Sequence, residues 1–441
     1  MSIDPNLPKN EGEYDIKIEK KTVEYYVKKD PTLLQGTSLI TSSKKALRDE
    51  NNKMHAAVYK GKRDIRILEV PRPLITDLTD AIVRITATSI CGSDLHLYNG
   101  EIPSSFVEGY TFGHEAVGIV DEVGVGVKKF KKGDRVVISS VVACGQCEYC
   151  LNGEMSCCDV TNKSATQKEM FGHNTSALFG YSELFGGLDG TQAEYVRVPV
   201  ADINLFRIPE GLDDKRALLV SDIACTGFHG CELADVREGD TVVIFGCGPV
   251  GLMTAMFAKF RKARIVISID IDSFRLQFAK THFSVETINS SQVDPIQAVL
   301  KILPLGPDKV IDCVGFRFPK SFLHKIQRTL GFETDSPNIL NSAIQMCRKN
   351  GKIALIGDYF GVMNGFLIGA FMNKHLAMRG GQLWPHKYKD IIFQALLNNE
   401  INPSVVFTHT IDLSKVPTAY YQLDKHDENL LKILIIPSNK S

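Results

Sequence analysis

Four cysteines form the densest group of potential metal ligands in the chain. Cys144, Cys147, Cys150 and Cys158 follow a C-x2-C-x2-C-x7-C pattern. Four thiolates in so short a segment match a tetrahedral zinc site, and such a zinc is structural because protein fills all four positions. Cys157 competes with Cys158 as the fourth ligand. Free core thiols are the alternative, but clustered cysteines rarely serve packing alone.

A further thiol and imidazole lie in the segments Cys91-Gly-Ser93-Asp-Leu-His96 and Gly113-His114-Glu115. A catalytic zinc takes three protein ligands and keeps a fourth position open, and Cys91 and His114 are both suitable donors. Either residue alone could equally be a buried core side chain. Glu115 is either a transient fourth ligand or a carboxylate that orients the ligands from behind, and we favour the second role.

A glycine-rich segment indicates a nucleotide site. The segment Phe245-Gly246-Cys247-Gly248-Pro249-Val250-Gly251 follows an apolar strand, Thr241–Phe245, and opens a helix with apolar residues on one face. In this context G-x-G-x-x-G is a strong dinucleotide signal. Gly246 permits the tight turn, Gly248 lets the backbone approach a pyrophosphate, and Gly251 allows close packing of helix on sheet. The helix N-terminus then attracts the phosphates.

The next predicted strand ends at Asp270, 19 residues after Gly251. A carboxylate at this place accepts a hydrogen bond from the ribose 2′-hydroxyl and repels a 2′-phosphate, so we expect NAD rather than NADP. Arg275 lies one helical turn further on. It either lies along the adenosine or is a solvated helix residue.

The elements that must position these residues fall into two classes. Residues 53–212 contain short runs of β-type residues between Gly and Pro, and no long helical pattern. After about residue 220, apolar strands alternate with helical stretches, which predicts a parallel α/β sheet. The final strand, near residues 430–436, is expected to rejoin the first domain. Residues 1–52 are polar, Lys-rich and aperiodic, and we read them as a flexible N-terminal extension.

Composition narrows the class of protein. The 441 residues suffice for two domains. Lys plus Arg and Asp plus Glu both number 51, which gives no electrostatic footprint for nucleic acid or for an anionic membrane. The N-terminus lacks a signal-peptide pattern, and no apolar run is long enough to span a bilayer. We therefore expect a cytoplasmic protein without nucleic-acid or membrane partners, whose clustered cysteines bind metal rather than form disulfides.

The Cys91 segment, the Gly-His-Glu segment, the four-cysteine lobe and the glycine motif, in this order, resemble the zinc-containing alcohol dehydrogenases of the medium-chain dehydrogenase/reductase family. The resemblance covers roughly residues 53–441. It implies a GroES-like β-rich catalytic domain (53–223 and 384–441) and a Rossmann NAD-binding domain (224–383) with a doubly wound parallel sheet. It also implies two zinc ions per chain, NAD, a small alcohol or aldehyde substrate, and a homo-oligomer, either dimer or tetramer.

One zinc ligand separates this chain from most of the family. The third catalytic ligand is usually a cysteine, four residues before a Thr-Gly pair, and that position here is Asp222, before Thr226-Gly227. A carboxylate oxygen is an acceptable, harder zinc ligand. Aspartate here resembles the glutathione-independent formaldehyde dehydrogenase branch, as do an insertion at 159–190 and another from Val314-Gly315 to about Asn338. Such insertions cover the bound NAD in that branch.

The resemblance implies hydride transfer between NAD and an alcohol or aldehyde hydrate, with formaldehyde, without glutathione, as the best candidate. Ser93 matches the position that takes the substrate proton, and His96 matches the far end of that relay. Thr226 and Val314 are expected to contact the nucleotide. One alternative is a dehydrogenase of another alcohol, a polyol or a longer aldehyde. The other is a catalytically silent nucleotide-binding protein, since a fold alone never fixes function.

Overall fold

The computed structural model describes residues 40–101, 107–315, 335–359, 361–425, 427 and 429–437. Most of the predicted second insertion therefore lies outside the described residues, as do residues 1–39 of the predicted extension. Strand β1 begins at Arg48, inside the predicted extension, and pairs with β2 from that residue onward. The segment before β1 is also held, since Ser43 N donates to Gly187 O at 2.9 Å.

The predicted β-rich part forms a seven-stranded sheet, in which β3 pairs with β4, β8 and β17. The C-terminal strand β17 lies antiparallel to β3, so the expected return of the chain end to this sheet is confirmed. A β1–β2 hairpin and a short β6–β7 pair lie outside the sheet. The strands of this part are β1 (Arg48–Gly61), β2 (Asp64–Pro73), β3 (Ala81–Ser89), β4 (Ala116–Val123), β5 (Arg135–Ile138), β6 (Val141–Val142), β7 (Ala177–Leu178), β8 (Tyr195–Val198), β9 (Leu205–Arg207), β16 (Phe407–Asp412) and β17 (Lys432–Ile436).

The predicted α/β part is a six-stranded sheet in the order β12-β11-β10-β13-β14-β15, with every pair parallel. The chain builds outward from β10 to β12 and then returns to β13 on the other side of β10. Ligands of such sheets bind at the carboxyl ends of the strands, where this reversal occurs. The strands are β10 (Thr241–Phe245), β11 (Ile265–Asp270), β12 (Glu286–Asn289), β13 (Lys309–Asp312), β14 (Lys352–Leu355) and β15 (Ala377–Gly380).

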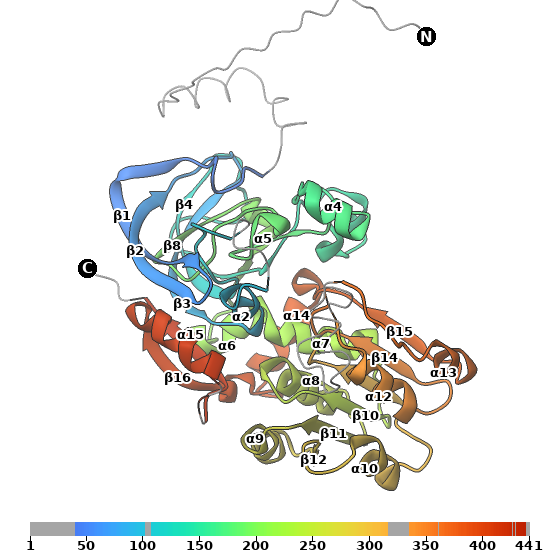
Figure 1. Cartoon of the computed structure of the whole chain (residues 1–441). Coiled ribbons are helices and arrows are strands. Elements are labelled where there is room, and N and C mark those ends of the chain that lie inside the picture. Colours follow the sequence, from blue (N-terminus) through green and yellow to red (C-terminus); the bar gives the residue numbers. More distant parts are fainter. Residues whose placement is uncertain are drawn as a thin grey trace, which may run out of the picture. The chain divides into compact units, whose positions relative to one another are not determined.

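Helices cover both faces of the parallel sheet, which explains why β10 is buried throughout and apolar from Val242 onward. Val242 and Ile244 pack into one core cluster with residues of α7 and α8, whereas Val243 and Phe245 pack into another with residues of α10 and α12. Figure 1 shows these helices around the sheet. The helices are α2 (Gly92–Tyr98), α3 (Glu148–Leu151), α4 (Ala165–Phe171), α5 (Ala201–Asn204), α6 (Asp214–Leu218), α7 (Ile223–Leu233), α8 (Pro249–Phe260), α9 (Ser273–Phe283), α10 (Pro295–Ile302), α12 (Asn338–Met346), α13 (Ile368–Asn373), α14 (Pro385–Leu397) and α15 (Val416–Lys425), and the 3-10 helices are η3 (Met155–Cys157), η4 (Glu183–Phe185), η5 (Leu219–Ser221), η6 (Pro403–Val406) and η7 (Leu413–Lys415).

Two sequence expectations bear on this architecture. Within the described residues, no helix combines the length and hydropathy that crossing a bilayer requires. The domain boundaries at residues 223 and 384 stay predictions. Both sheets are nevertheless continuous with one large core cluster, which includes Val117 and Val137 from the first sheet and Val242 and Ile244 from the second.

Candidate active site and metal centres

Four potential metal donors from distant parts of the chain meet at one buried point. They are Cys91, the residue before α2; His114 and Glu115, just before β4; and Asp222, the residue before α7. Their donor atoms all lie within 4.8 Å of one another, and each residue is at most 6% exposed. The structure therefore brings together the three predicted ligands of the catalytic zinc and places Glu115 beside them.

The donors converge on one carboxylate oxygen. Oδ2 of Asp222 lies 3.0 Å from Nε2 of His114 and 3.6 Å from Sγ of Cys91. The other oxygen, Oδ1, accepts a hydrogen bond from the hydroxyl of Thr226 at 2.8 Å. Thr226, which the sequence assigns to the nucleotide, thus fixes the rotation of the Asp222 carboxylate.

Asp94 orients two of these donors, and the sequence analysis gave it no role. Its Oδ1 lies 3.2 Å from Nδ1 of His114, and its Oδ2 accepts a hydrogen bond from the backbone N–H of Cys91 at 2.9 Å. A carboxylate behind a histidine fixes the ring and its tautomer, so that Nε2 of His114 points toward Asp222 and would be free to bind a metal. The signal that could have found it is its place in the Cys91 segment, three residues after the thiol.

The charges of the cluster suit a divalent cation. Burial raises the pKa of the Cys91 thiol to about 11, and the carboxylates of Asp222 and Glu115 add to that rise. Burial also disfavours the charged form of His114, but Asp94 and Asp222 raise its pKa well above the ordinary value. One thiol, two carboxylates and an imidazole held out of water form a donor set that fits zinc, whose binding displaces the thiol proton.

Glu115 already has a cationic partner. Nζ of Lys432, in β17, lies 2.6 Å from Oε2 of Glu115 and 2.9 Å from Oε1, and both side chains are at most 2% exposed. The hydroxyl of Ser89 donates to the same carboxylate. These contacts favour the orienting role for Glu115 over the role of a ligand. Lys432 was missed, although a lysine inside the apolar run of residues 430–436 signals a buried partner.

The two residues of the predicted proton relay lie on α2. The hydroxyl of Ser93 lies 3.8 Å from Sγ of Cys91, next to the donor cluster. His96 is 7% exposed, and its Nδ1 contacts the carboxylate of Glu101. Asp358, in the loop after β14, faces both relay residues, since its Oδ2 lies 3.4 Å from Oγ of Ser93 and 3.5 Å from Nε2 of His96. The sequence analysis did not identify Asp358.

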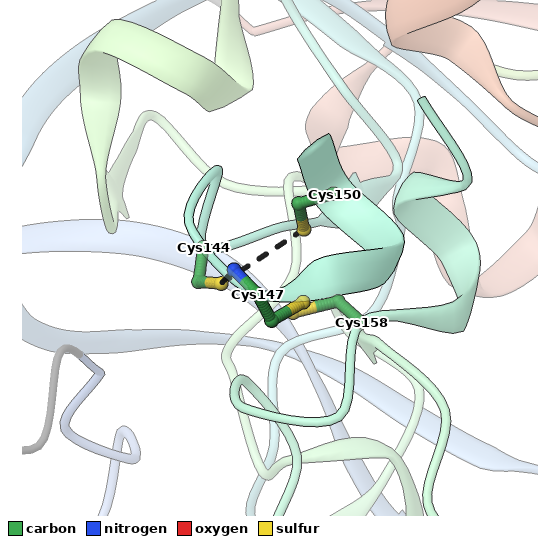
Figure 2. A group of neighbouring side chains, drawn as sticks. All are labelled: Cys144, Cys147, Cys150 and Cys158. Atoms are coloured by element: carbon green, nitrogen blue, oxygen red, sulfur yellow. Dashed lines mark hydrogen bonds between the residues drawn. The ribbon is translucent and has the colours of Figure 1, made fainter. Parts of the chain in front are cut away.

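The four-cysteine lobe is a second, separate cluster. Figure 2 shows the sulfurs of Cys144, Cys147, Cys150 and Cys158 facing one another, with 3.8 Å between Cys144 and Cys150 and 3.9 Å between Cys147 and Cys158. The donor atoms all lie within 4.8 Å of one another, and the cluster contains Cys158 rather than Cys157. Four sulfurs at this spacing fit a zinc with no open position.

The glycine motif takes the predicted form. Gly246 follows β10 with a φ of +95°, which favours glycine, and Gly248 immediately precedes Pro249, the first residue of α8. A side chain on Gly251 would lie 1.9 Å from the carbonyl oxygen of Gly246, so this position requires glycine. A side chain on Gly248 would meet only Nη1 of Arg275, at 4.0 Å, so the backbone there leaves room for a phosphate at the start of α8, where Pro249 and Val250 follow.

Residues predicted to hold the rest of the nucleotide surround this turn. Asp270 ends β11, and its Oδ2 accepts a hydrogen bond from Cys247 N at 2.6 Å. The guanidinium of Arg275 lies near Gly248, with Nη1 4.0 Å from the position that a side chain there would take. Val314, two residues after β13 ends, lies next to Gly246, where a side chain would be 3.0 Å from its Cγ2 atom. All of them lie around the carboxyl end of β10.

The first predicted insertion, at 159–190, is described in full and reaches the donor cluster. It carries α4 and η4, and the ring of Tyr181 lies edge-on to the His114 ring at 6.5 Å. The second insertion, from residue 315 to about 338, falls largely outside the described residues.

Comparisons with known proteins agree with this site. Residues 77–210 match the alcohol dehydrogenase GroES-like domain. The chain is 39% identical to the zinc-type alcohol dehydrogenase-like protein C1198.01 of Schizosaccharomyces pombe, over 86% of this chain and 90% of that protein. It is 32% identical to the glutathione-independent formaldehyde dehydrogenase of Pseudomonas aeruginosa, over 83% of this chain and 94% of that protein.

Among solved structures, the alcohol dehydrogenase TADH from Thermus sp. ATN1 matches with a TM-score of 0.74 and 31% identity, over 87% of this chain and 100% of that one. The predicted architecture of a GroES-like domain and a Rossmann-like domain is thereby confirmed. The enzyme class and the two cofactors, zinc and NAD, are confirmed with it. The chain belongs to the zinc-type alcohol dehydrogenases of the medium-chain dehydrogenase/reductase family and is a zinc-dependent, NAD-linked oxidoreductase.

Proposed function

We propose that this enzyme oxidises small aldehyde hydrates with NAD and without glutathione, and that formaldehyde is its first substrate candidate. The observation that carries the proposal is Asp222. Its Oδ2 is the atom on which His114 and Cys91 converge, at 3.0 and 3.6 Å. An oxygen in place of the usual sulfur leaves the metal more electrophilic, which favours loss of a proton from a bound hydrate hydroxyl. The relationship to a formaldehyde dehydrogenase supports the same substrate.

Each residue of the site has a defined task in this proposal. Cys91, His114 and Asp222 would hold the zinc, which when bound would supply Lewis-acid chemistry at the substrate oxygen. Asp94 and Thr226 fix the directions of the His114 ring and of the Asp222 carboxylate. The ammonium of Lys432 neutralises Glu115, so that Glu115 orients the site without occupying the open position.

Two residues of α2, Ser93 and His96, remove the proton from the substrate in this proposal. The Ser93 hydroxyl, beside the donor cluster, takes the proton of the reacting hydroxyl and passes on its own. His96 is the far end of this route, and its imidazole can accept a proton on one ring nitrogen and release one to water from the other. Both residues lie on α2, three positions apart, which places their side chains on the same side of the helix.

Gly246, Gly248 and Gly251 would hold the pyrophosphate of NAD at the start of α8, with Pro249 and Val250. Asp270 would bind the ribose, with Val314 and Arg275 beside it. NAD, when bound, is the hydride acceptor: methanediol and NAD⁺ give formic acid, NADH and one proton. If NADH is retained, a second aldehyde is reduced to the alcohol, and the net reaction is dismutation.

Three finer expectations from the sequence stay predictions. These are the assembly into a dimer or tetramer, the location in the cytoplasm and formaldehyde as the best substrate candidate. Relatives at 39% identity are named as zinc-type alcohol dehydrogenase-like proteins without a stated substrate. A dehydrogenase of another alcohol, a polyol or a longer aldehyde is therefore the second candidate.

The test is to incubate zinc-loaded protein with formaldehyde and NAD, without glutathione, and to follow the products by proton NMR. This readout also detects dismutation, which leaves no net NADH. Formate is expected, with methanol in equal yield if the nucleotide recycles in place. The matched control is Asp222→Cys, which restores the sulfur ligand and should keep zinc and alcohol oxidation while losing formate production. An absence of formate with the wild type, alongside oxidation of simple alcohols, would refute the proposed substrate.

A further inference from the structure

Asp358 is a carboxylate at the active site that the proposed mechanism leaves unused. Its Oδ2 lies 3.4 Å from Oγ of Ser93 and 3.5 Å from Nε2 of His96, and its side chain is 24% exposed. Among the residues that the structure describes, no lysine or arginine lies within ion-pair distance of it. A carboxylate offers about four acceptor sites. Asp358 therefore has spare capacity to accept a hydrogen bond from a ligand beside Ser93.

The fold holds this carboxylate in place from two sides. Asp358 follows β14 at the carboxyl edge of the parallel sheet. On one side Gly315 approaches so closely that a side chain there would lie 2.4 Å from the backbone oxygen of Asp358. On the other side the Tyr359 hydroxyl donates to Oδ2 of Asp312 at 2.5 Å. The loop is thus anchored, and ligands of such sheets bind at this edge.

We infer that Asp358 is a specificity-determining residue, which recognises the second hydroxyl of an aldehyde hydrate. The inference rests on the proposed function and deepens it. A hydrate carries two hydroxyls on one carbon, with the oxygens closer together than the 3.4 Å between Ser93 Oγ and Asp358 Oδ2. One hydroxyl can therefore give its proton to Ser93 while the other donates to Asp358. A monohydric alcohol leaves Asp358 without this donor.

The expected discrimination follows from the kind of bond. A hydrogen bond to a charged group contributes enough that its loss lowers kcat/KM by about 10- to 100-fold. Asp358 is partly exposed, so water can donate the hydrogen bond that a monohydric alcohol does not supply. The preference for the hydrate over the alcohol should therefore stay well below the roughly 10⁴-fold discrimination of fully buried sites that bind a substrate hydroxyl.

The first experiment compares two reactions of one aldehyde in the zinc-loaded full chain. Oxidation of acetaldehyde hydrate to acetate needs the second hydroxyl, whereas reduction of free acetaldehyde by NADH does not. In Asp358→Ala, kcat/KM for hydrate oxidation should fall by about 10- to 100-fold, while aldehyde reduction and ethanol oxidation change little. An equal loss in all three reactions, or no loss in any, would overturn the inference.

The matched control is Tyr359→Phe, which removes one anchor of the same loop and keeps the carboxylate. It should leave the ratio of hydrate oxidation to aldehyde reduction as in the wild type. A changed ratio in this variant would mean that loop position, and not the Asp358 carboxylate, sets the preference.

A binding readout separates this inference from the proposed function. Fluorine NMR of the zinc-loaded, nucleotide-free protein would give dissociation constants for trifluoroacetaldehyde hydrate and for trifluoroethanol. The hydrate should bind more tightly, and Asp358→Ala should remove that advantage, even if the wild type proves unable to oxidise formaldehyde. Equal affinities in the wild type, or an advantage that survives in Asp358→Ala, would refute the role of Asp358.

Discussion

Replacing Lys432 by methionine tests how the active site balances its charge. Nζ of Lys432 lies 2.6 and 2.9 Å from the two oxygens of Glu115 and also donates to the carbonyl oxygen of Ile90 at 3.2 Å. Both side chains of the pair are at most 2% exposed. Methionine keeps most of the volume of lysine and removes the charge. Glu115 would then be an unpaired carboxylate beside Cys91 and Asp222, within the 4.8 Å cluster.

The cost of this change can be bounded. At an effective dielectric constant of about 20, unit charges about 3 Å apart attract by about 5 kcal/mol. Desolvation offsets part of this in the wild type, but removing one partner of a buried pair exposes its full cost, about 3–5 kcal/mol of unfolding free energy. Replacing both partners with neutral groups of similar shape should cost far less.

The assay is urea unfolding of zinc-loaded protein in a double-mutant cycle of Lys432→Met, Glu115→Gln and the double variant. We expect Lys432→Met to be more destabilising than the double variant, with a coupling energy of about 2–3 kcal/mol. Zinc content after dialysis should stay at the wild-type level in the double variant if Glu115 only orients the site. A coupling energy near zero, with loss of one zinc in Glu115→Gln, would show that Glu115 takes its counter-charge from the metal and is a ligand.

Three other changes have defined outcomes. Cys91→Ala should abolish turnover and lower the zinc content from two ions to one while the circular dichroism stays native, because the four-cysteine site is separate; full activity with both zinc ions would contradict the assignment. Burial lowers the pKa of His229 from 6.5 to about 3 in the folded protein, and the charges of Arg379 and Lys387 add to this effect. Between about pH 6.5 and pH 3 the unfolded chain therefore carries a proton on this histidine that the folded protein lacks. Unfolding free energy should therefore fall as pH drops below about 6.5, by at most about 1.4 kcal/mol per pH unit, and His229→Asn should reduce that slope by the same amount in urea titrations at pH 7 and pH 5; an unchanged slope would refute it. Gly227→Ala should cost about 1–3 kcal/mol of unfolding free energy, because its Cβ would lie 2.6 Å from the backbone carbon of Met253, and a melting temperature equal to that of the wild type would argue against this close approach.

Features that depend on local spacing could be predicted from the sequence. The four cysteines span 15 residues, and the glycine motif follows its strand directly, so spacing alone places the donor atoms and the phosphate cradle. The central strands β10 and β11 were equally clear, because burial on both faces makes them apolar runs. The edge strands β12 (Glu-Thr-Ile-Asn) and β15 (Ala-Met-Arg-Gly) carry no such signal and were not predicted. The third zinc ligand, Asp222, needed the family resemblance, since nothing in its own neighbourhood distinguishes it from a helix-capping aspartate.

Features that depend on tertiary contact were missed. Lys432 lies 317 residues from Glu115, and Asp358 lies 265 residues from Ser93. No periodicity links such pairs, because the pairing of β17 with β3 and the position of the loop after β14 are set by the whole fold. Lys432 could have been suspected from the sequence, because it is a charged residue inside an apolar strand. Asp358 could not, because it lies in a loop, where aspartate is common.

The predicted catalytic zinc site and the predicted phosphate-binding turn lie at the starts of two neighbouring helices, α7 and α8. Asp222 directly precedes α7, and the phosphate cradle directly precedes α8. The two helices touch at Gly227, where even a methyl group would meet the backbone of Met253 and Thr254 at 2.6–2.7 Å. Close-packed backbones transmit displacement because they cannot deform independently. The close contact at Gly227 therefore fixes the distance between the start of α7, which carries the Asp222 carboxylate, and the start of α8, which carries the phosphate cradle.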